Sequence, residues 1–462
     1  MRLRTLLPTL GLLLLLPSAG FGLGTRLFDQ DAAATARGNA FTATADDPAA
    51  IFYNPAGIMQ LGDGFDVLSS VYDIKTEVQY RPLHDYDGKD SWNHQTWQPI
   101  PQLFMTYRPA NQVFAFGFGI YAPFGSEMEW PDDASFRSAG VYGSEHFIAF
   151  NPVMAVQITR TLSVGLGISA NYIDANLREG LTSSPGDYFS FKGDGLTVGG
   201  NAGILWQPTP QHSFGFSYHT PVSGDLTGHT QMGLNSSERS AAQAGNARIA
   251  AGKQQLNQAI DQINALPIPA GQKAYLIGQA TAQYDASLSA AGVPASGSFP
   301  TDFPTLASKG TLRFPQYAVL GYSFRPTPDW NVEADIDWTD WDSLNDFTLS
   351  RSDGSKVTVP FDWTHSFVYE IGITHLMGPY KLSVGYIYSE SSVPSGTFNP
   401  LIPDNARHLI SAGIGRTFGR CSVNIAYQLG IGPSRTIVND SAADGSYSFL
   451  SNAVSISLGY HF

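Results

Sequence analysis

The chain ends in AVSISLGYHF, residues 453–462, and this stretch decides the fold class. Every second residue from Val454 to Phe462 is apolar or aromatic, and the residues between them are small or polar. Because successive side chains of a β-strand point to opposite faces, the pattern predicts a strand with one apolar face and one small, polar face. The same alternation recurs at Leu162–Ile168, Leu382–Tyr388 and Val423–Leu429. The second face carries Gly, Ser and Ala, whereas the water-facing side of a soluble sandwich usually carries Lys, Glu and Thr.

The composition excludes several classes of protein. Of the 462 residues, 43% are hydrophobic, 12% are aromatic and only 14% are charged, against about 25% charged in soluble domains. No stretch after the first twenty residues approaches the roughly 18 apolar residues of a membrane-spanning helix. The net charge of −13 argues against nucleic acid as a partner, and the single Cys421 excludes a disulfide scaffold. A Gly-rich, aromatic chain with few charges is typical of a membrane β-barrel.

Residues 1–19 have the pattern of a signal peptide. Arg2 and Arg4 supply the positive charge, Leu6–Leu16 is an apolar run, and Pro17–Ala19 offers small residues for cleavage. A membrane anchor, the alternative, would need a longer apolar run. We therefore expect an exported protein.

The connections between the strand-like stretches alternate strictly between short and long, as in outer-membrane barrels with short periplasmic turns and long external loops. The long connections lie near residues 81–96, 122–144, 181–194, 223–309, 342–361, 391–405 and 432–445. Residues 62–462 are thus predicted to form an all-β, 14-stranded antiparallel transmembrane β-barrel. Its strands are expected at 64–80, 97–108, 112–121, 145–158, 162–180, 195–207, 212–222, 310–325, 330–341, 362–376, 380–390, 406–418, 421–431 and 446–462.

Two segments lack this pattern. Residues 20–61 are rich in Ala, Gly and Asp and precede the first strand. Residues 223–309 form a long insertion, predicted to be extracellular and helical. Its first helix carries an apolar stripe and ends at Pro267 and Pro269, and a second helix is expected from about Gln272. The stripe either packs the two helices together or lines a groove for substrate; it consists of Ile249, Leu256, Ile260 and Ile263.

The segment before the first strand carries the most specific motif. It contains Gly38-Asn39-Ala40-Phe41 and then the stretch 45–58, ADDPAAIFYNPAGI, with an Asn-Pro-Ala triplet at 54–56. This segment resembles the hatch of the long-chain fatty-acid transporter family of Gram-negative outer membranes, the FadL and TodX type, also called OMPP1. Later blocks are similar to that family too, at 314–316, 338–341, 385–394 and 402–407.

The resemblance implies a barrel plugged by a hatch, residues 20–61, that moves hydrophobic molecules inward. Asn54, Pro55 and Ala56 would hold the hatch, because Asn54 before a proline is extended and its amide can bond to the wall. The third strand would carry a kink that opens sideways into the bilayer. Glycine and proline weaken a strand, although glycine is common throughout this chain. The residues assigned to this lateral exit are Gly117, Gly119, Pro123, Phe124 and Gly125.

A fatty acid needs a cation or hydrogen-bond donors for its carboxylate. Strand alternation places Lys381 and Arg407 on the lumen side, and Arg178 is a third candidate. The alternative is that such cations pair with inward carboxylates of strand 330–341. Those carboxylates, Glu333, Asp335 and Asp337, would find partners in Arg26, Arg37 or Lys381. The sequence does not choose between the two.

No motif indicates an enzyme, a metal site or a cofactor. We expect an outer-membrane protein for the uptake of hydrophobic compounds, bound externally and released through the wall. Long-chain fatty acids are the first expectation and aromatic hydrocarbons the second; a diffusion porin and a barrel-anchored adhesin are the rivals from other classes. The expected partners are outer-membrane lipid and the barrel-assembly machinery, reached through the C-terminal aromatic strand, and we expect a monomer.

Overall fold

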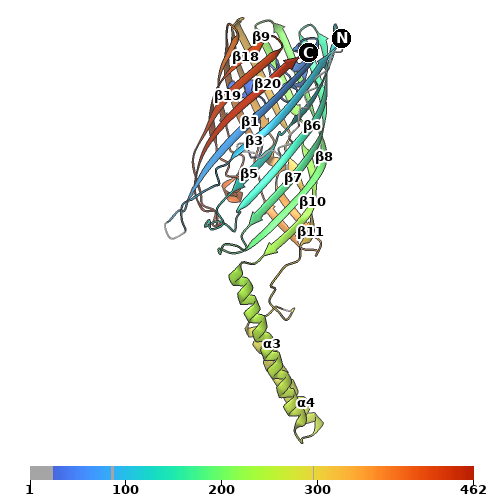
Figure 1. Cartoon of the computed structure of the whole chain (residues 1–462), viewed down its shortest axis with the longest axis vertical. Helices are drawn as coiled ribbons and strands as arrows, with labels where there is room; N and C mark the ends of the chain where they lie inside the picture. Colours follow the sequence, from blue (N-terminus) through green and yellow to red (C-terminus); the bar gives the residue numbers. More distant parts are fainter. Residues whose placement is uncertain (1–23, 85–87, 295) are drawn as a thin grey trace, which may run out of the picture.

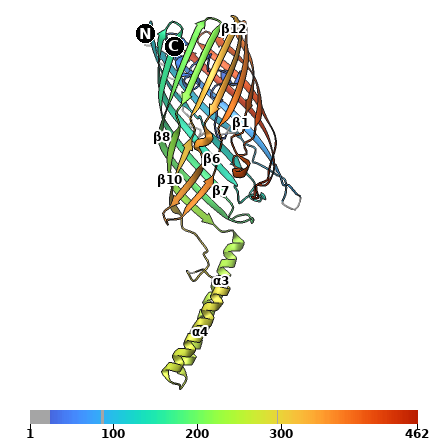
Figure 2. The same cartoon turned by 180° about the vertical axis from the view of Figure 1, so that it is seen from behind.

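A computed structural model of the chain describes residues 24–84, 88–294 and 296–462. The signal-peptide prediction lies outside these residues. The described strands form one antiparallel barrel, closed where β1 (Gly64–Arg81) pairs with β20 (Gly445–His461) (Figures 1 and 2).

The barrel has fourteen strands in the described residues, which confirms the predicted architecture. Three of them are interrupted and consist of two elements each: β4 with β5, β9 with β10, and β11 with β12. Between β1 and β20 the wall runs through β3 (Trp97–Arg108), β4 (Phe114–Tyr121) with β5 (Gly125–Glu129), β6 (Tyr142–Thr159), β7 (Leu162–Glu179), β8 (Tyr188–Thr209), β9 (His212–His219) with β10 (Val222–Gly233), β11 (Leu306–Phe314) with β12 (Tyr317–Thr327), β13 (Trp330–Thr339), β16 (Ser366–Met377), β17 (Tyr380–Ser389), β18 (Arg407–Phe418) and β19 (Cys421–Ile437).

The two ends of the barrel differ. The turn end carries the short connections and lies near the labelled C-terminus (Figure 1). The loop end carries the short strand β2 (Ser91–Trp92), the hairpin of β14 (Asp346–Arg351) and β15 (Lys356–Pro360), and two short 3-10 turns, Trp341–Ser343 and Ser395–Thr397. Beyond the loop end project α3 (Ser236–Ala265) and α4 (Ala270–Ala290). No described helix combines the length and apolar character needed to cross a membrane.

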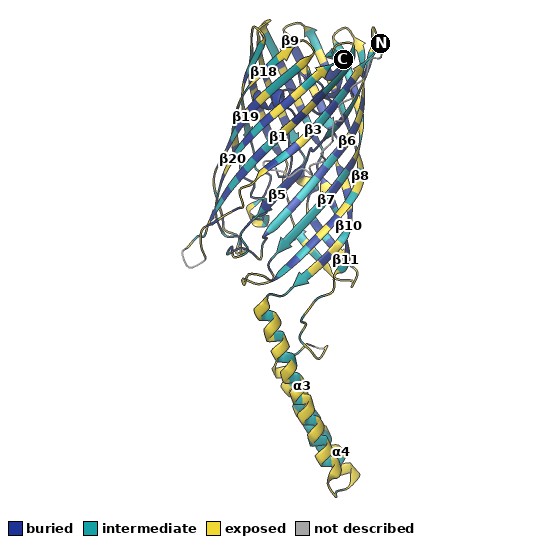
Figure 3. Cartoon of the chain, viewed as in Figure 1, coloured by how far each residue is buried: buried dark blue, intermediate teal, exposed yellow. Residues whose placement is uncertain are grey.

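The outer surface of the wall carries many exposed large apolar side chains, and Figure 3 shows exposed residues recurring along the strands. Leu166 is 66% exposed and Leu196 is 79% exposed, values that a water-facing surface would not favour. Toward the loop end the pattern inverts. There Leu226 of β10 and Leu312 of β11 are buried inside, whereas the exposed Asp225 lies on the outside. The strands therefore continue past the apolar band with their apolar side chains turned inward.

This inversion explains where the predicted boundaries were wrong. The insertion predicted at 223–309 is too long at both ends, because β10 runs to Gly233 and β11 begins at Leu306. The sequence also gave no sign of β5, nor of the β14–β15 hairpin within the predicted loop 342–361. Each of these elements lies at the loop end, where the lipid-facing alternation is missing.

Residues 24–60, the N-terminal segment, lie inside the barrel. The segment contains α1 (Ala32–Ala36), α2 (Ala50–Tyr53) and a 3-10 helix (Pro55–Gln60). Asp31 starts α1 by accepting hydrogen bonds from the backbone N–H groups of Ala33 and Ala34. Except for Asp46, Asp47 and Gln60, every residue of the segment is buried.

Glycines on the inner wall make room for this segment. A Cβ added to Gly385 of β17 would lie 2.0 Å from the backbone nitrogen of Gly38, and one added to Gly215 of β9 would lie 2.1 Å from the carbonyl oxygen of Thr42. The same holds on other strands, at Gly165, Gly203, Gly372 and Gly413. The small inner face that the sequence shows is therefore the surface on which the N-terminal segment rests.

Replacing Gly385 by valine should disturb this contact, because the new side chain meets the Gly38 backbone. We expect the free energy of unfolding to fall by about 1–3 kcal/mol, the usual cost of overpacking. Urea unfolding in lipid vesicles, followed by tryptophan fluorescence, measures the change. Gly396→Val is the control, since a Cβ at Gly396 has no atom within 4 Å. Equal midpoints for Gly385→Val and the wild type would contradict a closely seated segment.

Candidate functional site

The third strand of the barrel is broken. Its first half, β4, pairs with both β3 and β6, and its last pair toward β3 joins Ile120 to Leu103. Its second half, β5, pairs with β6 alone. Gly117 and Gly119 lie in the regular part of β4, where their missing side chains leave room for Ile51. The interruption itself is Ala122–Phe124.

The N-terminal segment contacts the chain at this break. The Gly125 N–H donates to the Thr25 carbonyl at 2.7 Å, and the Leu27 N–H donates to the Pro123 carbonyl at 2.9 Å. The Gln30 side-chain amide donates to the Ala122 carbonyl at 2.8 Å. Residues 25–30 therefore take up backbone groups that an unbroken strand would pair with β3.

Two further strands break close to the same place, and each break contains a proline. Residues 220–221 separate β9 from β10, and residues 315–316 separate β11 from β12. The ring of Phe124 packs against Phe314 at 5.0 Å and against Tyr317 at 6.3 Å between centroids. The breaks thus surround one aromatic cluster beside the N-terminal segment.

Buried ionic contacts anchor the segment to β13. Arg26 donates to Asp337 at 2.5 Å, and its guanidinium lies 3.6 Å from the centroid of the Tyr317 ring. Arg37 pairs with Glu333 at 3.2 Å. All four charged side chains are buried. These are two of the pairings that the sequence offered as the alternative to ligand binding.

The middle carboxylate of β13 is held differently. Asp335 accepts hydrogen bonds from the backbone N–H groups of Phe41 at 3.1 Å and Thr42 at 2.9 Å.

On another side of the segment, burial raises the pKa of Asp29 to about 6, although hydrogen bonds from Asn39 and Gln428 act against this rise. The segment is therefore bound through several buried carboxylates.

Asn54 ties the segment to β8 as well. Its side-chain amide donates to the Ile204 carbonyl of β8 at 3.0 Å and to the Thr42 carbonyl at 2.8 Å. Its side-chain oxygen accepts from the Ala56 N–H at 3.2 Å. Pro55 and Ala56 rest against the wall, where a Cβ on Gly165 would lie 2.4 Å from the Pro55 carbonyl carbon.

The three cations selected from the sequence lie in separate places. Lys381 is near the turn end, 4.0 Å from Asp46. Arg407 is buried at the opposite end of the neighbouring strand, 3.6 Å from Asp404 and 3.7 Å from the Phe449 ring centroid. Lys381 pairs with Gly415, eight residues along β18 from Arg407, which corresponds to about 26 Å of strand.

Arg178 lies on a different part of the wall, near the loop end of β7, where it pairs in register with Tyr142 and Ser190. Its Nε atom is buried without a hydrogen-bond partner. The structure therefore does not bring the three cations together into one head-group site.

Sequence reasoning missed a cavity of about 90 Å³ in the loop half of the barrel. Apolar side chains from several strands and loops form most of its lining, among them Leu177, Phe191, Leu312, Phe347, Phe361 and Leu401. One carboxylate, Glu145 of β6, lines it as well. The alternation of Gly143, Glu145 and Phe147 was the available signal, since it places the carboxylate on the inner face.

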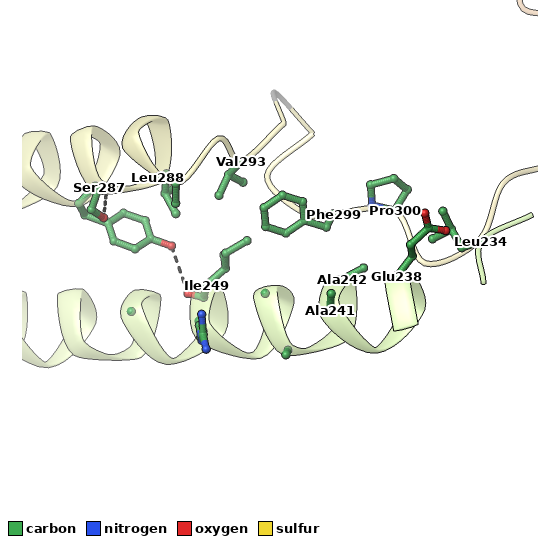
Figure 4. A pocket seen from close by; sticks show the side chains of 16 residues that line it. Leu234, Glu238, Ala241, Ala242, Ile249, Ser287, Leu288, Val293, Phe299 and Pro300 are labelled. Carbon is green, nitrogen blue, oxygen red and sulfur yellow. Dashed lines mark hydrogen bonds between the residues drawn. The ribbon is translucent and has the colours of Figure 1, made fainter. Parts of the chain in front are cut away.

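The helical hairpin carries a groove of about 840 Å³ between α3, α4 and the chain that returns to the barrel (Figure 4). Ile249 lines the groove, opposite Leu288 and Val293. The other stripe residues, Leu256, Ile260 and Ile263, are partly buried on α3. No group of three or more His, Cys, Asp or Glu suited to a metal ion occurs within the described ranges.

The comparison with known proteins decides the family. Residues 16–462 match the model of the family described as outer membrane protein transport protein (OMPP1/FadL/TodX). The chain belongs to this family. It is 22% identical over 408 residues to a long-chain fatty acid transport protein of Escherichia coli, covering 81% of this chain and 79% of the relative.

Solved structures agree on the FadL/TodX fold. A FadL homologue from Pseudomonas aeruginosa matches with a TM-score of 0.73 at 19% identity, over 95% of this chain and all of that chain. The Pseudomonas putida toluene transporter TodX matches with a TM-score of 0.63 at 15% identity, over 97% and 99%. The protein is thus an outer-membrane β-barrel for the transport of hydrophobic compounds, and its relatives are transporters.

The anchoring by β13 can be tested at Arg26. Arg26→Met leaves Asp337 buried without its partner, and we expect a loss of about 3–5 kcal/mol in the free energy of unfolding. The double variant Arg26→Met/Asp337→Leu should lose less, because no charge is left unpaired. Urea unfolding provides the measurement. Lys89→Met, which removes an exposed pair with Asp133, serves as the control and should change little. A loss as small as that of the control would refute the anchoring role.

Proposed function

We propose that this protein takes up hydrophobic compounds at the external face and releases them sideways through the broken third strand. Residues 24–60 act as the hatch, and a rearrangement of residues 25–30 frees the opening. The observation that carries the proposal is the missing ladder between β3 and β5, whose place is taken by backbone contacts of the hatch.

The physical chemistry of the cargo supports a lateral route. Each CH₂ group left in water costs about 0.8 kcal/mol, so an aqueous channel is a poor path for a hydrophobic molecule. A gap in the wall leads from an apolar interior into lipid without that cost. Isolated contacts bridge this gap in place of a ladder: the Gln98 amide donates to the Glu127 carbonyl at 3.4 Å, and toward the loop end the His94 N–H donates to the Glu129 carbonyl at 2.8 Å.

Small uncharged compounds are the cargo that the geometry supports best. The cavity of about 90 Å³ is lined largely by apolar groups, and no Lys, Arg or His is among its described lining residues. A small uncharged cargo also agrees with the fold, because a protein described as a toluene transporter shares it.

Long-chain fatty acids are the second candidate, and one observation favours them. Both terminal nitrogens of Arg407 are buried without a hydrogen-bond partner, as expected of a cation that awaits a carboxylate. Against this, Asp404 already lies beside the guanidinium, and the neighbouring cavity measures only about 20 Å³.

A disulfide across the gap tests the lateral route. Gln98→Cys with Glu127→Cys, in a Cys421→Ser background, should stop the uptake of labelled toluene and oleate once oxidised, because β3 and β5 can no longer separate. Reduction should restore uptake. The control pair, Met105→Cys with Phe118→Cys, joins β3 to β4 where they are already paired and should leave uptake intact. Normal uptake through the oxidised gap would exclude this exit.

Competition between toluene and oleate on the purified protein distinguishes the two cargo classes. We expect toluene to bind with an affinity that Arg407→Gln does not change, and oleate to compete weakly. If oleate displaces toluene and Arg407→Gln weakens oleate by tenfold or more, which is about 1.4 kcal/mol, the fatty-acid candidate is correct instead.

A further inference from the structure

The cavity in the loop half contains a polar group that neither the fold nor the hatch accounts for. Glu145 projects from the inner face of β6, between the inward Gly143 and Phe147. Its Oε1 atom is buried and has no hydrogen-bond partner. Buried carboxylate oxygens rarely lack a hydrogen-bond partner, because burial removes their hydrogen bond to water and the loss costs free energy unless another group replaces it.

Glu145 is also linked to the broken strand. It pairs in register with Ser126 of β5, and the neighbouring Gly125, just after the break, donates its N–H to the carbonyl of Thr25. Ser126, the next residue, lines the same cavity. The cavity therefore lies beside the gap through which cargo would leave.

The charges around Glu145 favour one kind of ligand. None of the cavity's described lining residues is a cation. His146, the next residue along β6, points to the other face of the sheet. There it pairs with Asp174 of β7 at 3.0 Å. A carboxylate cargo would thus meet a carboxylate without a compensating charge.

We infer that Glu145 is a specificity-determining residue, which accepts a hydrogen bond from an uncharged, ring-sized hydrophobic cargo bearing one O–H group and disfavours anionic cargo. This inference rests on the proposed function and narrows its substrate class to phenol-like molecules. The apolar lining holds the ring, and the free Oε1 supplies the single acceptor. A plain hydrocarbon fills the same space but leaves the acceptor unpaired.

The experiment uses the full mature protein in lipid nanodiscs and three probes of similar shape: p-cresol, toluene and p-toluate. Calorimetric titration at about pH 9, where Glu145 and p-toluate are ionised and p-cresol is mostly neutral, gives each affinity after correction with empty nanodiscs. We expect the wild type to bind p-cresol about tenfold more tightly than toluene, and p-toluate more weakly still, in line with a charge-assisted hydrogen bond and like-charge repulsion.

Glu145→Gln should reduce the preference for p-cresol over p-toluate by about tenfold, because the repulsion disappears. Glu145→Arg should reverse it. Glu129→Gln is the matched control: the same change on β5, at a half-exposed carboxylate that lies against His94 and does not line the cavity, should leave the preference as it was. Heat-dependent migration on gels verifies that each variant is folded.

The outcomes separate the two proposals. Equal affinities for the three probes in the wild type, or an unchanged preference in folded Glu145→Gln, would overturn the role of Glu145 while leaving the uptake function standing. If no probe binds beyond the empty nanodiscs and cells gain no uptake of hydrophobic tracers, both proposals are wrong.

Discussion

Three carboxylates on one strand cannot be left alone inside a barrel, and much of this structure follows from that constraint. Glu333, Asp335 and Asp337 point inward from β13 and are buried. An unpaired charge in such a place would cost several kcal/mol. Arg26, Arg37 and two backbone N–H groups of residues 41–42 balance them, and all of these belong to the N-terminal segment. These contacts therefore hold the segment in place, and a rearrangement of residues 25–30 has to compensate the charge of Asp337.

The position of the N-terminal segment inside the barrel accounts for features of the remaining wall. Glycines take the inner positions where the segment touches the strands, and prolines interrupt the three strands that border the aromatic cluster. At the interruption of the third strand, the same stretch that carries Arg26 also takes over the backbone hydrogen bonds. Residues 25–30 therefore carry both the anchoring charge of Arg26 and the hydrogen bonds to the wall, so a change at one of these contacts also alters the other.

The sequence predicted those parts of the fold that depend on lipid contact. Alternation such as that of residues 454–462 marks strands whose outer face is apolar, and it led to the confirmed number of strands. The alternation does not predict strands at residues 223–233 and 306–309. These residues lie beyond the apolar band, toward the loop end, where the strands turn their apolar side chains inward. The inward carboxylates of β13 were predicted from alternation, and Arg26 and Arg37 were among the partners considered for them as the alternative to ligand binding. The separation of Lys381 from Arg407 was missed although the predicted connections contain it: Lys381 begins a strand after a short turn and Arg407 begins one after the long loop 391–405, but the two were grouped by strand face alone.

The N-terminal segment touches strands from nearly the whole circumference of the barrel, and this has a consequence for folding. Arg26 and Asp337 lie 311 residues apart in the chain, and Gly38 meets β17 while Asn54 meets β8. Such distant contacts form slowly, since the intervening loops must close first. No partly built sheet offers all these partners, so the segment and the closed wall should form in one cooperative step. The residues nearest the start of the folded chain are then among the last to reach their native neighbours.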